Sequence, residues 1–244
     1  MLIIFDLDDT LIDTFGCSQP VKFRLALKKM IQAGLKVTSF DAAFQQLMEI
    51  NKTTTNGKET LRRFLNPCHS SENIYALGVN TYYGGKQFNF PVHALEGALD
   101  LLTYLRDQHH DLVLITSGVK EEQYGKMKKA KIDPSVFRKI ILTGDYNKKK
   151  EYLIIQKDLA YPPHEIIVCG DKFKTDLLPA KELGMKTVHV LWGRGKVDFP
   201  SPGEVDYSIT KLRELKKIIA DYDLKTNRSC DSSRRRRQTP PPFN

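Results

Sequence analysis

Three carboxylates stand together near the start of the chain, at Asp6, Asp8 and Asp9, and Thr10 follows them. They come directly after residues 2–5, an apolar run typical of a parallel strand that is buried on both faces. Carboxylates this close repel one another, and a hard divalent cation such as Mg²⁺ is the usual solution in proteins. An aspartate beside Mg²⁺ can also act as a nucleophile and form an aspartyl-phosphate. The alternative is an acidic surface turn, which rarely follows a fully apolar strand so closely.

Two more apolar runs end in polar side chains. One is followed by Thr116 and Ser117, and hydroxyls beside backbone N–H groups can hold phosphate oxygens. Another is followed by Asp171, and Asp176 lies five residues later. Taken alone, the threonine–serine pair is a weak signal because such pairs are common in turns. The two acidic clusters together are a stronger one, because both end apolar strands.

A run of three lysines, Lys148, Lys149 and Lys150, precedes a helix that we expect over 151–159. Positive charge at the start of a helix opposes the helix dipole. A functional lysine would explain this placement. A solvated charge run is an equally good interpretation without further context.

The elements that must position these side chains alternate along the chain. Runs typical of buried strands occupy 2–5, 112–115, 139–142, 166–169, 187–190 and 205–209. Strands that alternate with helices are typical of βαβ units, so the sequence predicts an α/β fold with a doubly wound parallel sheet. Ligands of such sheets bind beyond the carboxyl ends of the strands. The side chains expected there are Asp6, Asp8, Thr116, Lys148, Asp171 and Asp176.

Residues 16–92 interrupt this pattern, because they contain no run of strand type and repeat their apolar residues at helical spacing. Four helices are expected in this insertion, over 21–33, 40–50, 58–65 and 71–83. A further helix is expected over 93–108. The predicted organisation is an α/β core of residues 1–15 and 93–224, a helical insertion of residues 16–92, and a disordered basic tail of residues 225–244.

The charge of the chain is concentrated at its end. The net charge is +9, and residues 225–244 carry six positive charges against one negative charge, so +5 lies in the tail and +4 elsewhere. The remainder is only mildly basic, which suits an anionic substrate without requiring nucleic acid. The tail leaves nucleic acid or an anionic surface open as a partner, although a solubilising or vestigial end is the preferred interpretation.

Composition excludes several other classes of protein. The hydrophobic fraction of 41% is sufficient for a globular core, and no apolar run is long enough to cross a membrane. No basic segment precedes the first apolar run, so a signal peptide is not expected. Cys17, Cys68, Cys169 and Cys230 lie far apart, which argues against a zinc site or a disulfide framework. The sequence predicts a cytoplasmic protein with reduced thiols and does not predict its oligomeric state.

The motifs resemble those of the haloacid dehalogenase superfamily. Residues 6–10 read DLDDT, which is similar to the first motif, DxDx[TV], and the strand that ends in Thr116 is similar to the second. Lys148 stands 23 positions before Asp171, a spacing similar to that of the third motif. The pattern GDxxxxD, which ends at Asp176, is similar to the fourth. The resemblance covers residues 1–222 and places the insertion where the superfamily has a C1-type helical cap.

Three features depart from the common pattern of the superfamily. Asp9 replaces a frequent glycine, and Lys172 replaces a frequent serine. The third motif also lacks the common Lys-Pro form.

The resemblance implies a Mg²⁺-dependent phosphatase that acts on a small phosphorylated metabolite. It implies that Asp6 is the nucleophile and that Asp8 is the general acid and base. Members that act as dehalogenases typically lack the second aspartate, so Asp8 favours phosphoryl transfer. A phosphomutase with the same motifs, or a non-catalytic regulatory or binding protein on this scaffold, are the alternatives.

The resemblance also implies two sets of binding residues. The Mg²⁺ ligands would be Asp6, Asp8 through its backbone carbonyl, Asp171 and Asp176. The phosphate-binding residues would be Thr116, Ser117, Lys148 and Lys149, with Lys148 preferred to Lys149 as the lysine of the third motif.

Overall fold

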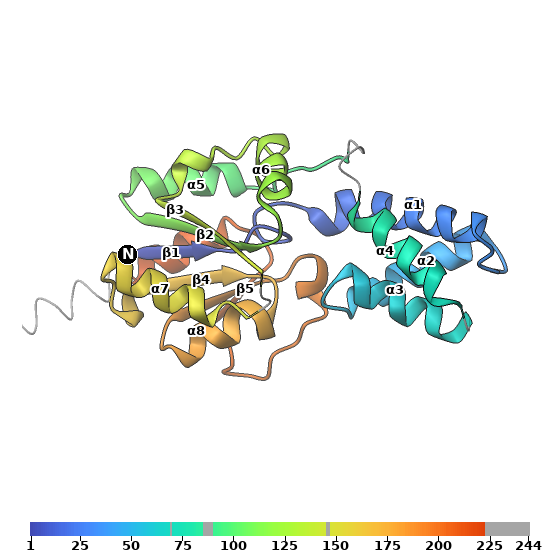
Figure 1. Cartoon of the computed structure of the whole chain (residues 1–244). Coiled ribbons are helices and arrows are strands. Elements are labelled where there is room, and N and C mark those ends of the chain that lie inside the picture. Colours follow the sequence, from blue (N-terminus) through green and yellow to red (C-terminus); the bar gives the residue numbers. More distant parts are fainter. Residues whose placement is uncertain (69, 85–89, 145–146, 223–244) are drawn as a thin grey trace, which may run out of the picture.

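The computed structural model of the protein describes residues 1–68, 70–84, 90–144 and 147–222, so the predicted basic tail lies outside the described residues. A twisted sheet with helices on both faces lies beside a separate group of helices (Figure 1). All strand pairs in this six-stranded sheet are parallel, in the order β3-β2-β1-β4-β5-β6. The strands are β1 Leu2–Phe5, β2 Asp111–Ser117, β3 Lys139–Thr143, β4 Ile166–Gly170, β5 Lys186–Val190 and β6 Tyr207–Ile209. The predicted α/β fold with a doubly wound parallel sheet is confirmed.

The central strands are buried on both faces because they consist almost entirely of branched and aromatic apolar residues. Helices α5 (Ala98–Asp107) and α6 (Lys120–Lys129) cover one face, together with a helical segment over 214–222. Helices α7 (Lys149–Leu159) and α8 (Leu178–Glu182) cover the other. Strand β1 lies between β2 and β4, with Phe5 paired to both Leu114 and Cys169. This register brings the carboxyl ends of the three strands to one edge of the sheet.

The helix expected from residue 93 begins later, at Ala98. Gly97 precedes it with a left-handed backbone, φ +82°, which breaks the helical path. The preceding residues instead pair with the segment that follows β1. The Asp13 N–H donates to the His93 carbonyl at 2.9 Å, and the Leu95 N–H donates to the Leu11 carbonyl at 2.9 Å. The two places where the chain passes between sheet and insertion are therefore held together.

The insertion forms four helices, as its apolar spacing predicts. They are α1 Gln19–Gln32, α2 Phe40–Lys52, α3 Gly57–Leu65 and α4 Glu72–Tyr83. They pack around their own apolar core, which includes Phe23, Leu27, Met30, Leu47, Leu61 and Phe64. We call this group the bundle; it faces the carboxyl edge of the sheet (Figure 1). Its function as a cap stays a prediction at this point.

None of the helices in the described part combines the length and the apolar character needed to cross a bilayer.

Candidate active site

Three aspartates meet at the carboxyl edge of the sheet. Asp6 follows β1, Asp171 follows β4, and Asp176 lies in the short π-helical segment η5 (Phe173–Leu177). One carboxylate oxygen from each lies within 4.8 Å of the others, and all three side chains are buried. Parallel strands bring these residues together although Asp6 and Asp171 are far apart in sequence.

This cluster has the properties of a cation site. Both carboxylate oxygens of Asp171 are buried and have no hydrogen-bond partner among the described residues. A buried carboxylate without a partner is costly, and a hard cation with oxygen ligands would remove that cost. A Cβ atom at Gly170 would lie only 2.7 Å from Cβ of Asp176. The glycine therefore permits the close approach of the two acidic segments.

Lys148 completes this cluster. It occupies the N-cap position of α7, and its side chain is 3% exposed. Its Nζ lies 2.6 Å from Oδ1 of Asp6 and 2.7 Å from Oδ1 of Asp176. Lys149 points elsewhere, since its side chain is 44% exposed and its Nζ lies 2.7 Å from a carboxylate oxygen of Glu182. The structure therefore brings Lys148 to the site and does not bring Lys149 there.

Burial dominates the electrostatics of these groups. It raises the pKa of Asp6 to about 6, even though the neighbouring Lys148 ammonium acts in the opposite direction. Burial also raises the pKa of Asp171 well above its usual value. The pKa of Lys148 is raised as well, because the charges of Asp176 and Asp6 outweigh the effect of its burial. The ammonium of Lys172 also acts on Asp6 and Asp171, but the three carboxylates still exceed the two ammonium groups in number, so the site favours additional positive charge.

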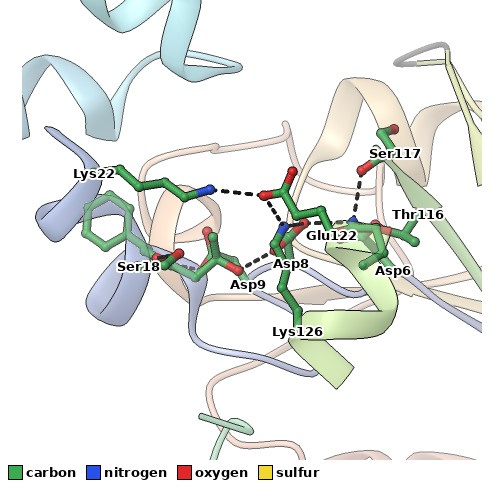
Figure 2. A network of polar contacts seen from close by, with 12 residues as sticks. Asp6, Asp8, Asp9, Ser18, Lys22, Thr116, Ser117, Glu122 and Lys126 are labelled. Carbon is green, nitrogen blue, oxygen red and sulfur yellow. Dashed lines mark hydrogen bonds and ion pairs between the residues drawn. The ribbon is translucent and has the colours of Figure 1, made fainter. Parts of the chain in front are cut away.

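Asp8 contacts side chains of helix α6 (Figure 2). Lys126 Nζ is 3.0 Å from each of its carboxylate oxygens, and Gln123 Nε2 donates to Oδ2 at 3.1 Å. Thr14 Oγ1 also donates to this carboxylate. Burial alone would raise the pKa of Asp8, but Lys126 and these hydrogen bonds hold it well below its usual range. The structure thus holds Asp8 as a carboxylate.

The hydroxyl of Thr116 lies close to Asp8 because Gln123 joins the two. Gln123 Nε2 is 2.6 Å from Oγ1 of Thr116 and 2.9 Å from the backbone carbonyl of Ser117. Thr116 is buried at the end of β2, and both Thr116 and Ser117 border the cleft described below. The predicted phosphate-binding hydroxyls are therefore beside the predicted acid–base residue.

Asp9, which replaces a frequent glycine, has a left-handed backbone with φ +59°. Aspartate tolerates this conformation better than most residues. Its Oδ1 accepts a hydrogen bond from the backbone N–H of Phe15 at 2.6 Å, at the start of the bundle. Burial raises its pKa to about 7. Asp9 thus connects the acidic loop to the segment that leads into the bundle.

A cleft of about 490 Å³ lies between the sheet edge and the bundle. Asp6, Asp8, Thr116, Lys148 and Asp176 line it from the sheet. The bundle contributes Gln19, Lys22, Thr55, Asn56, Gly57, Tyr82 and Tyr83. Most of these bundle side chains have polar groups. The cleft is therefore suited to a small hydrophilic molecule.

Several residues of this site are not predicted by the sequence. Gln123 and Lys126 are three positions apart, which places them on one face of the helix that follows Thr116. That spacing directly after a strand-end motif is a signal that could have indicated them. Lys22 and Arg194 had no comparable signal, because they reach the cleft only through the packing of the bundle against the sheet.

Comparison with known proteins agrees with this geometry. The sequence model of the haloacid dehalogenase-like hydrolases matches residues 3–190, most of the chain. The chain belongs to this family. The predicted membership and the predicted enzyme class, a hydrolase of phosphoric monoesters, are confirmed by this match and by relatives named phosphatases.

Relatives of known name cover nearly the whole chain. Glyceraldehyde 3-phosphate phosphatase of Pyrococcus furiosus is 30% identical over 228 residues, which are 89% of this chain and 92% of the relative. Human N-acylneuraminate-9-phosphatase is 24% identical over 93% of this chain and 96% of the relative. Both are similar to this chain over the sheet and the bundle alike.

Solved structures share the fold at lower sequence identity. The predicted phosphoglycolate phosphatase from Haemophilus somnus has a TM-score of 0.68 at 17% identity, over 89% of this chain and 97% of its own. YfnB from Bacillus subtilis, whose structure contains magnesium, has a TM-score of 0.62 at 20% identity over the same shares. At such identities these similarities concern the fold alone.

Proposed function

We propose that this hydrolase is a Mg²⁺-dependent phosphatase that cleaves a small phosphorylated metabolite through an aspartyl-phosphate at Asp6. The observation that supports this most is the position of the Asp6 carboxylate. It lies in the cleft, 2.6 Å from the ammonium of Lys148 and next to the unpartnered carboxylate of Asp171. A nucleophile in these surroundings is suited to attack an anionic phosphate once positive charge is present.

The residues that would hold Mg²⁺ are Asp6, Asp171 and Asp176 through their carboxylates and Asp8 through its backbone carbonyl. When bound, the ion would offset the repulsion between the anionic nucleophile and the phosphate and would orient the phosphoryl group.

In the first step, a carboxylate oxygen of Asp6 attacks phosphorus, and the bond between phosphorus and the leaving oxygen breaks. The leaving oxygen takes up a proton from Asp8, so the alcohol leaves neutral; because Lys126 and Gln123 favour the carboxylate of Asp8, it carries this proton only within the catalytic cycle, after the second step has delivered it. Lys148 keeps Asp6 ionised before the attack and compensates charge that develops on the phosphoryl oxygens. The hydroxyl of Thr116 donates a hydrogen bond to one of these oxygens.

In the second step, a water molecule attacks phosphorus of the aspartyl-phosphate and releases inorganic phosphate and free Asp6. Asp8 accepts the proton of that water, which requires its carboxylate form. The structure holds Asp8 in this form through Lys126 and Gln123. Asp8 receives the water's proton in this step and is then protonated for the next turnover.

The lining of the cleft suggests the substrate class. Gln19, Thr55 and Asn56 can donate to and accept from hydroxyl groups, so a hydroxylated phosphate ester fits better than an apolar one. Several relatives, at 26–32% identity, are named glyceraldehyde 3-phosphate phosphatases. A triose phosphate is therefore the first substrate to test, and a sugar acid 9-phosphate is the second.

Phosphate release from a panel of esters tests this proposal. The panel contains the esters glyceraldehyde 3-phosphate, N-acetylneuraminate 9-phosphate and the glucose phosphates, together with the acyl phosphate acetyl phosphate, each with Mg²⁺, with Ca²⁺ and with EDTA. We expect release with Mg²⁺, none with EDTA, and little with Ca²⁺, because its looser and higher coordination spoils in-line attack. Full activity in EDTA would contradict the metal assignment. Phosphate that moves within a sugar phosphate without release would indicate a mutase, and no turnover of any ester would indicate a non-catalytic protein.

A further inference from the structure

Arg194 extends from the sheet into the bundle. It lies in the short 3₁₀ segment η6 (Gly193–Lys196) that follows β5, and it is only 7% exposed. Its Nε donates to the backbone carbonyl of Asn51 at 3.0 Å, and its Nη2 donates to Oδ1 of Asn51 at 2.6 Å. Its Nη1 donates to the carbonyl of Thr55 at 3.1 Å. All three acceptors belong to the bundle.

The hydrogen-bond partners of Arg194 either line the cleft from the bundle or bond to residues that do. Asn51 is fully buried, and its Nδ2 donates to Oε1 of Gln19 at 2.6 Å. Gln19 lines the cleft, as do Thr55 and the following Asn56. One guanidinium is therefore linked, directly or through one side chain, to two separate segments of the cleft wall.

The chemistry of this contact is unusual for a purely structural one. Every hydrogen-bond acceptor of Arg194 is neutral, and within the described residues it forms no direct ion pair, although its charge acts on the nearby Asp9 carboxyl. Burying a cation without a hydrogen-bonded carboxylate is costly, and apolar side chains would join two elements at lower cost. A planar guanidinium, however, fixes the direction of several hydrogen bonds at once. That property is what the precise placement of a cleft wall requires.

We propose that Arg194 is a positioning residue for substrate selection, which holds Gln19 and residues 53–56 of the bundle over the phosphate site. This inference rests on the proposed phosphatase function. Loss of the contact leaves the reacting groups at the sheet edge in place but releases the wall that contacts the leaving group. We therefore expect loss of the Arg194 contact to reduce the discrimination between substrates, mainly by raising KM.

The chain contains its own reporter of this contact. Trp192 is its single tryptophan, and it stands two residues before Arg194. Its Nε1 donates to Oδ1 of Asp13 at 2.9 Å, just before the chain enters the bundle. The indole is already partly exposed and packs against the sheet core, while η6, directly after it, contacts α2 of the bundle. We expect release of η6 from α2 to change the surroundings of this indole, so acrylamide quenching of its fluorescence reports on η6 without any turnover.

The test compares Arg194→Met and Arg194→Lys with Arg106→Met, a control at an exposed arginine that pairs with Asp107 on α5. For Arg194→Met we expect kcat/KM on the best sugar or triose phosphate of the panel to fall by about 10–100-fold, chiefly through KM, because hydrogen bonds of a charged group are lost. For acetyl phosphate, which has a minimal leaving group, the fall is smaller by a factor of about five or more. Arg194→Lys restores part of the discrimination, and acrylamide quenching rises for Arg194→Met alone.

If kcat/KM falls by the same factor for the sugar or triose phosphate and for acetyl phosphate, and quenching stays at the level of the control, the proposal is overturned. If Arg194→Met does not fold, Asn51→Leu removes the side-chain partner from the bundle side, and the same shift in discrimination and quenching is required of it. Failure of the proposed function would be visible separately, as a wild-type protein that releases no phosphate. The quenching comparison then still decides whether Arg194 keeps η6 in contact with the bundle.

Discussion

Lys126 Nζ lies 3.0 Å from both carboxylate oxygens of Asp8, although the two residues are 118 positions apart. The same ammonium is 3.6 Å from Glu122, which in turn accepts from Lys22 of the bundle at 3.0 Å. Positive and negative charges thus alternate from Lys22 of the bundle to Asp8 (Figure 2). Movement of the bundle therefore changes the electrostatic surroundings of Asp8 through two side chains of α6.

Lys126→Met tests whether this contact supports catalysis. The variant removes the ammonium that orients Asp8, so we expect kcat to fall by about 10–100-fold with a smaller change in KM. Lys128→Met is the matched control, because Lys128 is exposed on the same helix. Steady-state kinetics on the best ester of the panel measures both. Equal kcat for the two variants would show that Lys126 serves only the fold.

Asp6→Asn tests the nucleophile. The amide oxygen can still accept a hydrogen bond from Lys148, so the fold should persist, but an amide cannot attack phosphorus. We expect turnover to fall by about 1,000-fold or more while the circular dichroism spectrum stays that of the wild type. Mass spectrometry of acid-quenched wild-type protein should detect a phosphoryl group on the peptide that contains Asp6. Turnover at the wild-type rate in the variant would show that Asp6 is not the nucleophile.

Lys148→Met and Lys149→Met form a matched pair of neighbouring lysines. Loss of Lys148 removes the ammonium between Asp6 and Asp176, so we expect a decrease in kcat/KM of about 100-fold or more. Loss of Lys149 removes an exposed ion pair with Glu182, and we expect less than about a twofold effect. Similar losses in both variants would contradict the distinct positions that the structure gives them.

The stability of the metal-free protein should decrease as pH rises from about 4 to about 7. Burial raises the pKa of Asp9 to about 7 and that of Asp6 to about 6, so in this range the folded protein binds more protons than the unfolded chain. The lowered pKa values of Asp8 and His189 act in the opposite direction, that of Asp8 mainly below pH 5, whereas Asp6, Asp9 and Asp171 all have raised pKa values and together outweigh them. We expect Tm in EDTA to fall by roughly 5–10 °C between pH 5 and pH 8.

Two comparisons check the origin of this pH dependence. Asp9→Asn removes one titrating group, and its amide oxygen can still accept from the N–H of Phe15, so the slope of Tm against pH should become shallower. Added Mg²⁺ should raise Tm more at pH 8 than at pH 5, because the ligands are ionised there. A Tm in EDTA that is constant or increases over this range would show that these carboxyls are not held protonated by burial.

The sequence by itself determined the fold and the acidic part of the site. Apolar runs as short as residues 2–5 indicate strands buried on both faces, and polar residues directly after such runs must lie at one edge of a parallel sheet. This local rule was sufficient to predict that Asp6, Thr116, Asp171 and Asp176 lie together. The helical spacing of residues 16–92 likewise predicted four helices, because an amphipathic face is visible in sequence.

Only the tertiary structure decided which of Lys148 and Lys149 reaches the carboxylates and revealed the contacts of Gln123, Lys126 and Arg194. Adjacent lysines at a helix start are equivalent in sequence, and the direction of each depends on how α7 is seated against the sheet. Arg194 meets Asn51 across 143 positions, a contact that exists only because the bundle packs against the sheet edge. Long-range polar contacts of this kind leave no periodic trace in the sequence, because they depend on side-chain direction and packing rather than on local pattern.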